Sequence, residues 1–342
     1  NLNGVDMASR DQANRILLPQ KISQAEAKVQ ALRATFKMNP SEYYRHDRVP
    51  KSKVAVNSEL EWEEKRLADL KAIRSTLEEN EEDRQSDPSI PRRGLVYMDD
   101  SKKDDRVKVA ISTGDVDRAK HVSTILPGMN NVPSEDINDH VKNAELVHKH
   151  AADNAHISQD QVATIAWMYD TPQGGQVVSS KYATKASHEI GSALEGMHAF
   201  RHTNGIERAH TSLLGHSYGS TTAGKVAKMI RKGVLDDLVM YGSPGAGAHD
   251  AREYNLDHGR PYVSGIKSDD AVKGKGTLNS KFGNNPMFMP GVKHLANNSE
   301  RDRLFFIPWK MFDRHSEYLE EGTSSLEDIS RVVTNVPVKG EK

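Results

Sequence analysis

The chain has 342 residues, and its 47 basic and 48 acidic side chains leave a net charge of -1. This balance gives no electrostatic reason to expect a nucleic-acid partner or an anionic membrane surface. The absence of cysteine excludes disulfides, thiolate metal sites and cysteine nucleophiles. No apolar run approaches the roughly 20 residues that a membrane-spanning helix needs. The chain begins with Asn1 and lacks an apolar signal core, so we expect a soluble fragment or processed form, cytoplasmic or secreted.

Residues 1–90 have the pattern of two helices, separate in character from the rest of the chain. Each helix carries an apolar stripe at helical spacing, which places the stripe on one face. The first stripe comprises Leu18, Ile22, Ala25, Val29, Leu32 and Phe36, and the second comprises Leu60, Leu67, Leu70 and Leu77. We predict an antiparallel, coiled-coil-like helical hairpin that ends in a polar linker over residues 78–91. One interpretation is that the stripes serve structural packing. The other is that they serve partner binding or self-association.

From residue 91 to residue 342, short apolar runs alternate with helical patterns. Strands are expected at residues 95–98, 107–111, 122–126, 162–169, 209–214, 238–241, 262–266 and 304–307, and helices at 137–155, 179–200 and 221–231. Such alternation predicts an α/β domain with a mostly parallel central sheet and helices on both faces. The first two strands are expected to form a hairpin. In sheets of this kind, ligands bind at the carboxyl ends of the strands.

The motif Gly215-His216-Ser217-Tyr218-Gly219 lies where an expected strand meets an expected helix. G-x-S-x-G in this context is the pattern of a tight turn that holds a serine hydroxyl above the end of a sheet. The glycines let the two backbones approach closely, and the helix N-terminus directs free N–H groups toward developing negative charge. Ser217 is therefore the expected nucleophile. The alternative is an ordinary glycine-rich turn whose serine caps the helix.

A serine nucleophile needs a base and an orienting acid, and in this architecture the acid follows the serine and the histidine comes last. The acid belongs just past a later strand, where Asp269 and Asp270 follow the apolar run at residues 262–266. We favour Asp270, because a small apolar step comes directly after it. Asp250, past the preceding strand, is an outside candidate.

The base and the oxyanion donors complete the expected site. His315 opens a helix-like segment and is preferred as the base over His294, which lies in a less defined loop. Backbone N–H groups must also hold the oxyanion, and the first comes from Tyr218, the residue after the nucleophile. The second is assigned to Met129, because Gly128 allows a tight turn after an earlier strand. A plain Pro-Gly turn is the alternative at that place.

Several motifs in one order resemble the actinobacterial DUF1023 family of α/β-hydrolase-fold proteins, over residues 110–318. They are Gly114-Asp115, Ala119, His121-Val122, Leu126-Pro127-Gly128-Met129, Ile165-Ala166-Trp167-Met168-Tyr169-Asp170-Thr171-Pro172, residues 214–220, Tyr241-Gly242-Ser243-Pro244-Gly245, Asp270-Ala271-Val272 and His315-Ser316-Glu317-Tyr318. The resemblance implies an α/β-hydrolase fold with Ser217 as nucleophile, Asp270 as acid and His315 as base. This chain departs from the family pattern at Ala271, where the family has proline, and at Met168, where it has glycine.

The sequence therefore predicts a helical arm and linker over residues 1–90 and an α/β-hydrolase domain over residues 91–342. The expected activity is that of a serine hydrolase, esterase- or lipase-like, on a small-molecule ester or related acyl bond; peptidase activity stays open. The alternatives are a non-catalytic scaffold that uses the arm, and an acyltransferase with a non-water acceptor. No dinucleotide, phosphate-loop or metal motif has the required spacing, so neither a cofactor nor a metal is expected. Residues 272–314 are either a lid over an acyl pocket or a loop that braces the sheet.

Overall fold

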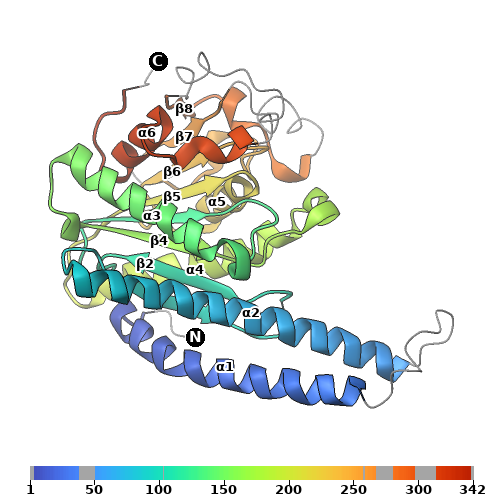
Figure 1. The fold of residues 1–342 in the computed structure, drawn as a ribbon. Helices are drawn as coiled ribbons and strands as arrows, with labels where there is room; N and C mark the ends of the chain where they lie inside the picture. The colour runs from blue at the N-terminus through green and yellow to red at the C-terminus, as the bar shows by residue number, and fades with distance from the viewer. Residues whose placement is uncertain are drawn as a thin grey trace.

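The computed structural model describes residues 4–37, 51–102, 104–256, 259–266, 280–296 and 313–339. Within these ranges, one sheet has the strand order β1-β2-β4-β3-β5-β6-β7-β8 (Figure 1). The strands are β1 (Arg93–Asp99), β2 (Lys108–Thr113), β3 (His121–Leu126), β4 (Val162–Met168), β5 (His210–His216), β6 (Asp237–Tyr241), β7 (Pro261–Ser264) and β8 (Lys293–His294). The α-helices are α1 (Met7–Lys37), α2 (Lys51–Ser86), α3 (Pro133–Ala155), α4 (Lys181–Thr203), α5 (Tyr218–Met229) and α6 (Ser324–Val333). Short 3-10 helices used below are η4 (Ala251–Glu253) and η10 (Asp313–Leu319).

The sheet is mostly parallel, as predicted. β1 pairs antiparallel with β2, which confirms the predicted hairpin, and β2 pairs antiparallel with β4. The pairs that run from β4 through β3, β5, β6 and β7 to β8 are all parallel. The register aligns Leu126 of β3 with Gly215 of β5, and His216 of β5 with Tyr241 of β6. The carboxyl ends of these three strands therefore meet at one end of the sheet, where the G-x-S-x-G motif lies.

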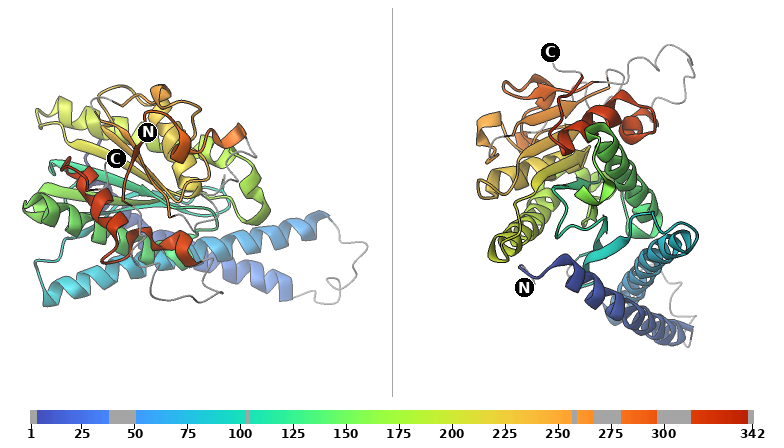
Figure 2. Two further views of the ribbon diagram at one scale, coloured as in Figure 1. Left: turned by 90° about the horizontal axis from the view of Figure 1, so that it is seen from above. Right: turned by 90° about the vertical axis from the view of Figure 1, so that its left-hand side faces the viewer.

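Helices cover both faces of the sheet, because its central strands are apolar on both sides. Consecutive side chains of a strand point to opposite faces. In β5, Leu213 belongs to the apolar cluster of α4 and α5, whereas Leu214 belongs to the cluster of α3 and α6. Figure 2 shows the two helix layers on either side of the sheet. The layered α/β architecture expected from the sequence is confirmed.

The α1–α2 hairpin packs on the β1 side of the sheet (Figure 1). Its inner face belongs to the same apolar cluster as Leu95 of β1 and Val109 of β2. The buried residues of that face are Leu18, Ile22, Ala25, Leu70, Ile73 and Leu77. Asp117 fixes the start of α1, because its carboxylate accepts the N–H groups of Met7 at 2.9 Å and Ala8 at 3.0 Å. The apolar face of the hairpin is thus used within the chain, and the domain boundary at residue 90 stays a prediction.

The prediction of a linker over residues 78–91 is wrong in its extent. Helix α2 continues to Ser86, and only a short polar segment connects it to β1. Glutamate has a high helix propensity, so the acidic run extends the helix instead of ending it. Pro88 then disfavours helical geometry at Asp87, and the chain leaves the helix there.

Other differences concern the ends of elements. α5 begins at Tyr218 and not at residue 221, because the turn at Ser217 passes directly into the helix. α3 begins at Pro133, before the predicted start at residue 137, since proline fits the first turn of a helix. The strand predicted at residues 304–307 lies outside the described residues. None of the described helices has both the length and the apolar character needed to cross a membrane.

The described part of the segment 272–314 is bonded to the sheet region. The N–H of Gly247 donates to the Phe282 carbonyl at 2.7 Å. The Asn284 carbonyl accepts the Ala246 N–H at 2.9 Å, and the Asn284 N–H donates to the Ala248 carbonyl at 2.8 Å. For residues 280–296, these contacts therefore fit the expectation of a loop that braces the sheet.

Candidate active site

Ser217 occupies the turn between β5, which ends at His216, and α5, which begins at Tyr218. Its backbone has φ 51° and ψ -124°, a conformation that side-chain-bearing residues rarely adopt. Two hydrogen bonds hold this backbone in place. The Ser217 N–H donates to the Tyr241 carbonyl at 2.9 Å, and the Ser217 carbonyl accepts the Ser220 hydroxyl at 2.6 Å. The predicted strand–serine–helix junction is confirmed, with the serine held in a strained turn at the end of the sheet.

The two glycines of the motif are required by close backbone contacts. A Cβ atom on Gly215 would lie 2.6 Å from the carbonyl oxygen of Gly219. A Cβ atom on Gly219 would lie 2.5 Å from the carbonyl oxygen of Pro127. Both distances are below any normal contact, so a larger residue would force the backbones apart. The second contact also places the loop after β3 directly against the start of α5.

The loop after β3 also lies against Ser217. A Cβ atom on Gly128 would be 2.9 Å from Ser217 Cβ and 3.3 Å from Ser217 Oγ, so the approach depends on glycine. Tyr169 fixes this loop, because its hydroxyl donates to the Pro127 carbonyl at 3.2 Å and accepts from Thr222 Oγ1 at 3.0 Å. Burial raises the pKa of the Tyr169 phenol, which keeps it protonated as a donor.

Two backbone N–H groups at this place, those of Met129 and Tyr218, have no hydrogen-bond partner in the described ranges. Tyr218 is the first residue of α5, where an N–H has no intrahelical acceptor. The Met129 side chain packs against the small apolar cluster that contains Tyr218, so the two predicted donors belong to neighbouring residues. Ser217 stands at the N-cap of α5, yet its side chain makes no capping hydrogen bond. The alternative that this serine serves to cap the helix is therefore not supported.

His315 lies in η10, beside the residue that precedes the nucleophile. Its carbonyl accepts a hydrogen bond from His216 Nε2 at 2.6 Å, and the two imidazole rings have centroids 4.8 Å apart. Ser217 Oγ forms no hydrogen bond with any residue that the structure describes, so His315 contacts the residue next to the nucleophile without bonding the nucleophile itself. Hydrogen bonds between catalytic groups are often long before substrate binds. The structure thus brings Ser217, His315 and the Gly128 loop to the same end of the sheet.

Asp269 and Asp270 lie outside the described residues, but the chain that leads to them can be followed past β7. The N–H of Ile266 donates to the Tyr318 hydroxyl at 3.0 Å. Tyr318 belongs to η10, the same short helix as His315. The segment that carries the two candidate acids therefore starts beside the segment that carries the candidate base.

The alternative acid and the alternative base lie elsewhere. Asp250 caps η4 at the surface and pairs with Arg252 at 2.7 Å. The hydrogen bonds from Arg252 lower the pKa of Asp250 to about 2. His294 is in β8, opposite Val263 of β7. β8 is three strands away from β5, which is about 14 Å at the usual strand spacing.

The sequence motifs contain three aromatic residues to which sequence reasoning assigned no role at this site: His216, Tyr241 and Tyr318. The centroid separations are 5.2 Å between His216 and Tyr241, 5.6 Å between Tyr241 and Tyr318, and 6.0 Å between His216 and Tyr318. A cavity of about 150 Å³ opens beside His216 and Tyr241 on the α3 side. The sequence does contain one signal for two of these residues: His216 and Tyr241 each end the apolar run of a strand, and the two strands are neighbours.

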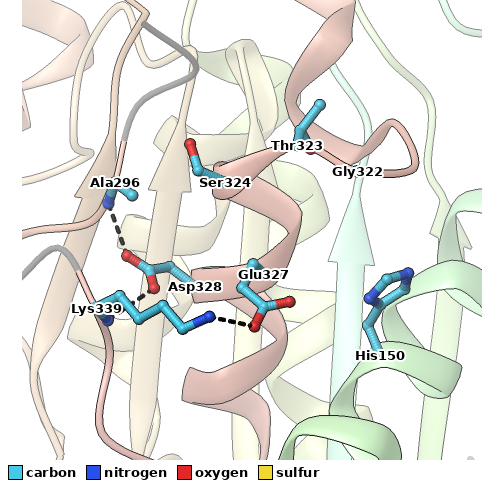
Figure 3. Close-up of a pocket in the computed structure, with 8 residues that line it drawn as sticks. All are labelled: His150, Ala296, Gly322, Thr323, Ser324, Glu327, Asp328 and Lys339. Atoms are coloured by element: carbon cyan, nitrogen blue, oxygen red, sulfur yellow. Dashed lines mark hydrogen bonds and ion pairs between the residues drawn. The ribbon is translucent and has the colours of Figure 1, made fainter. Parts of the chain in front are cut away.

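A larger pocket of about 310 Å³ lies at α6 and is lined by none of the candidate site residues (Figure 3). Asp328 accepts the N–H groups of Ala296 at 2.8 Å and of Lys339 at 2.9 Å. Glu327 accepts a hydrogen bond from Lys339 Nζ at 3.1 Å. These carboxylates attach two other chain segments to α6, so the pocket is part of the packing around this helix.

Comparison with known proteins identifies relatives of this chain. Residues 102–280 match a family model described as alpha/beta hydrolase. An uncharacterized protein of Mycobacterium bovis is 29% identical over 242 residues, which cover 68% of this chain and 84% of that protein. An uncharacterized protein of Mycobacterium tuberculosis is 34% identical over 184 residues, which cover 51% of this chain and 26% of that protein.

Two esterases are among the similar solved structures. A hyperthermophilic esterase from the archaeon Pyrobaculum calidifontis has 11% sequence identity and a TM-score of 0.44, with 77% of this chain and 93% of that chain covered. A fungal esterase from Rhizomucor miehei has 13% identity and a TM-score of 0.38, with 75% and 90% covered. The family match spans more than half of the 342 residues and includes the strand–serine–helix turn at Ser217, and the chain therefore belongs to the alpha/beta hydrolase family.

Proposed function

We propose that the protein is a serine hydrolase that cleaves a carboxylic ester or a related acyl bond through an acyl-enzyme on Ser217. The observation that carries this proposal is the φ of 51° at Ser217, in the turn between β5 and α5. Strained backbone of this kind persists where the surrounding structure holds it, and it is common at active sites. Membership of the alpha/beta hydrolase family supports the same reaction class. The mycobacterial relatives accord with the DUF1023 resemblance, which we keep as part of the proposal.

In the proposed reaction, His315 takes the proton of the Ser217 hydroxyl while Ser217 Oγ attacks the acyl carbonyl carbon. The N–H groups of Met129 and Tyr218 donate to the oxyanion of the tetrahedral intermediate. His315 then gives its proton to the leaving oxygen, and the alcohol departs. In the second half of the reaction, His315 deprotonates a water molecule that attacks the acyl-enzyme. The carboxylic acid leaves, and Ser217 regains its proton.

The orienting acid is proposed from the sequence. Asp270, with Asp269 as the alternative, follows Ile266, whose N–H donates to Tyr318 of η10. A carboxylate behind His315 would accept from the imidazole Nδ1–H, hold the ring in one tautomer and stabilise the imidazolium. The start of this segment beside η10 is what supports an acid at this place.

The acyl group is proposed to lie on the side of Met129 and Tyr218. There, Met129, Val177 and Phe282 pack as partly buried side chains against Tyr182 and Tyr218. Phe282 meets the Tyr218 ring edge-on, with a centroid separation of 5.9 Å. Apolar and aromatic lining beside a few polar groups is typical of small-molecule pockets. We therefore expect an apolar acyl group.

The two alternatives are a non-catalytic scaffold and an acyltransferase with a non-water acceptor. A non-catalytic scaffold that uses the α1–α2 hairpin gains no support from the packing, because the inner face of the hairpin lies against the chain's own sheet. Acyl transfer to a non-water acceptor would use the same residues. Adding hydroxylamine or glycerol as an acceptor, and measuring the transfer product against the free acid, separates transfer from hydrolysis.

Ester turnover by the wild type and two serine variants tests the proposal. p-Nitrophenyl acetate, butyrate and octanoate are the substrates, and the variants are Ser217→Ala and Ser330→Ala. Ser330 is a matched control on α6, because its buried hydroxyl has no partner among the residues described. We expect turnover by the wild type and Ser330→Ala, and a fall of about 1,000-fold or more in Ser217→Ala. Folded wild-type protein that is no faster than Ser217→Ala would contradict the proposal.

A further inference from the structure

The turn that carries His315 lies outside the sheet. Two of the described hydrogen bonds attach this turn to the ends of sheet strands. His216 Nε2 donates to the His315 carbonyl at 2.6 Å. The Tyr318 hydroxyl accepts the N–H of Ile266 at 3.0 Å. The first bond reaches the end of β5, next to Ser217, and the second reaches the chain just past β7. One short turn is thus fixed to two different strand ends.

Aromatic rings fill the space between these two bonds. The His216 ring stacks on Tyr241 with an interplanar angle of 25° and a centroid separation of 5.2 Å. On another side it lies 4.8 Å from the His315 ring, at an angle of 41°. Tyr318 is fully buried, and its ring contacts those of His216 and Tyr241. Offset and tilted rings at such separations attract one another, so the turn is packed as well as bonded.

We infer that His216 and Tyr318 are positioning residues that hold the turn of His315 beside Ser217. This inference rests on the function proposed above, in which His315 is the base. His216 fixes the turn to the strand that carries the nucleophile, and Tyr318 fixes it to the chain that leads to the proposed acid. Catalytic groups must be held to within about 0.5 Å of their productive geometry, and side chains locked by packing and hydrogen bonds achieve this.

The role of His216 requires a hydrogen-bond donor as well as a ring. A carbonyl oxygen only accepts, so His216 Nε2 carries a proton when it bonds His315. Phenylalanine at this position keeps an aromatic ring and removes the donor, whereas glutamine keeps an N–H donor and removes the ring. At position 318, phenylalanine keeps the ring and leaves the Ile266 N–H without its acceptor. These substitutions separate anchoring from simple filling of space.

Steady-state kinetics with p-nitrophenyl butyrate compare wild type with His216→Phe, His216→Gln and Tyr318→Phe. The control is His121→Phe, because His121 makes a similar tilted ring contact with His210, at 6.0 Å, but lies at the start of β3, at the opposite end of the sheet. We expect kcat to fall about 10- to 100-fold in His216→Phe and Tyr318→Phe, with KM changed less than about threefold. His216→Gln is expected to recover part of the kcat, and His121→Phe to stay within about twofold of wild type.

Hydrogen exchange at residues 313–319, followed by mass spectrometry, reports on the turn independently of activity. Loss of either anchor is expected to speed amide exchange there by about tenfold, whereas His121→Phe leaves it unchanged. If His216→Phe does not fold, Tyr318→Phe is used for the same comparison, because it removes the other anchor.

The inference and the proposed function fail in different ways. Equal exchange at 313–319 in wild type and both anchor variants would overturn the inference, whatever the activity. An active wild type with an unchanged kcat in both anchor variants would also overturn it. Faster exchange in the anchor variants together with a folded but inactive wild type would instead overturn the proposed function.

Discussion

The N–H of Ser217 donates to the carbonyl of Tyr241 at 2.9 Å, which ties the proposed nucleophile to the neighbouring strand. This bond lies where the register pairs His216 with Tyr241, so β5 and β6 end together. The φ of 51° at Ser217 therefore follows from the pairing of two strands and from the close contacts of the motif glycines. A serine held by the sheet itself needs little rearrangement to react.

Gly128→Ala is expected to impair catalysis with little effect on folding. A Cβ atom there would lie 2.9 Å from Ser217 Cβ, so either the loop or the serine must shift. Misplacement of reacting groups by about 1 Å costs on the order of 100-fold in rate, and we expect a fall of that size in kcat/KM for p-nitrophenyl butyrate. Gly175→Ala is the matched control, because nothing lies within 4 Å of its Cβ position. Unchanged kcat/KM in Gly128→Ala would contradict the proximity of this loop to the reacting atoms.

Tyr169→Phe is expected to lower both activity and stability. The lost hydroxyl leaves the Pro127 carbonyl and Thr222 without a partner at a buried site, which costs about 1–3 kcal/mol in free energy of unfolding. The loop after β3, which carries the proposed oxyanion donor Met129, loses an anchor, so kcat should fall several-fold. Tyr254→Phe removes a similar buried hydroxyl, bonded to the Ala246 carbonyl at 2.7 Å. We expect Tyr254→Phe to match the stability loss in urea denaturation and to keep the wild-type kcat; equal losses of kcat would contradict a specific role of Tyr169.

Two buried histidines make the stability depend on pH. Burial lowers the pKa of His140 and the pKa of His148 to about 4, from an ordinary value of 6.5. In the unfolded chain these rings take up protons near pH 6.5, whereas in the folded protein they do so near pH 4. The folded protein is therefore fully stabilised above pH 6.5 and loses stability as the pH falls toward 4. Each ring contributes on the order of 3 kcal/mol to this loss.

His148→Leu tests this origin of the acid sensitivity. Neither ring nitrogen of His148 has a hydrogen-bond partner in the described part of the chain, so leucine removes no described bond. In urea denaturation between pH 4.5 and 7.5, the free energy of unfolding should depend less on pH in His148→Leu than in wild type. His202→Leu changes an exposed ring and should keep the wild-type slope. If the free energy of unfolding depends on pH equally in His148→Leu and wild type, His148 is not a source of the acid sensitivity.

Asp117→Asn is expected to loosen the attachment of α1 to the sheet region. The Asp117 carboxylate accepts the N–H groups of both Met7 and Ala8, whereas the asparagine amide keeps one acceptor oxygen and replaces the other with an NH2 donor. We expect a loss of about 1–2 kcal/mol in free energy of unfolding and faster proteolysis within α1. Asp250→Asn, at the exposed cap of η4, should leave the free energy of unfolding almost unchanged. Equal losses in the two variants would contradict a special role of Asp117.

The layers of the fold and the turn at Ser217 could be predicted from the sequence, because local rules determine them. Central strands buried on both faces carry apolar residues on both sides, as Leu213 and Leu214 show. A Cβ atom on either motif glycine would lie 2.5 or 2.6 Å from a backbone oxygen, so the spacing of these glycines marks the turn. The linker prediction failed because glutamates occur both in polar loops and in exposed helices, and here the helix continued.

The surroundings of His315 could not be predicted, because its contacts depend on the tertiary structure. His216 and His315 are far apart in the chain, and no periodic pattern relates them. Their contact requires the register that aligns His216 with Tyr241, and a turn at η10 that brings Tyr318 to Ile266. The sequence order of serine, acid and base limits the candidates, but it does not say what holds the base in place.

Labelling with a fluorophosphonate probe, followed by peptide mass spectrometry, tests the central claim most directly. We predict one adduct per folded chain, located on Ser217, and none in Ser217→Ala. Folded wild-type protein that carries no adduct on Ser217, under conditions that label a reference serine hydrolase in the same mixture, would contradict the assignment of Ser217 as the nucleophile.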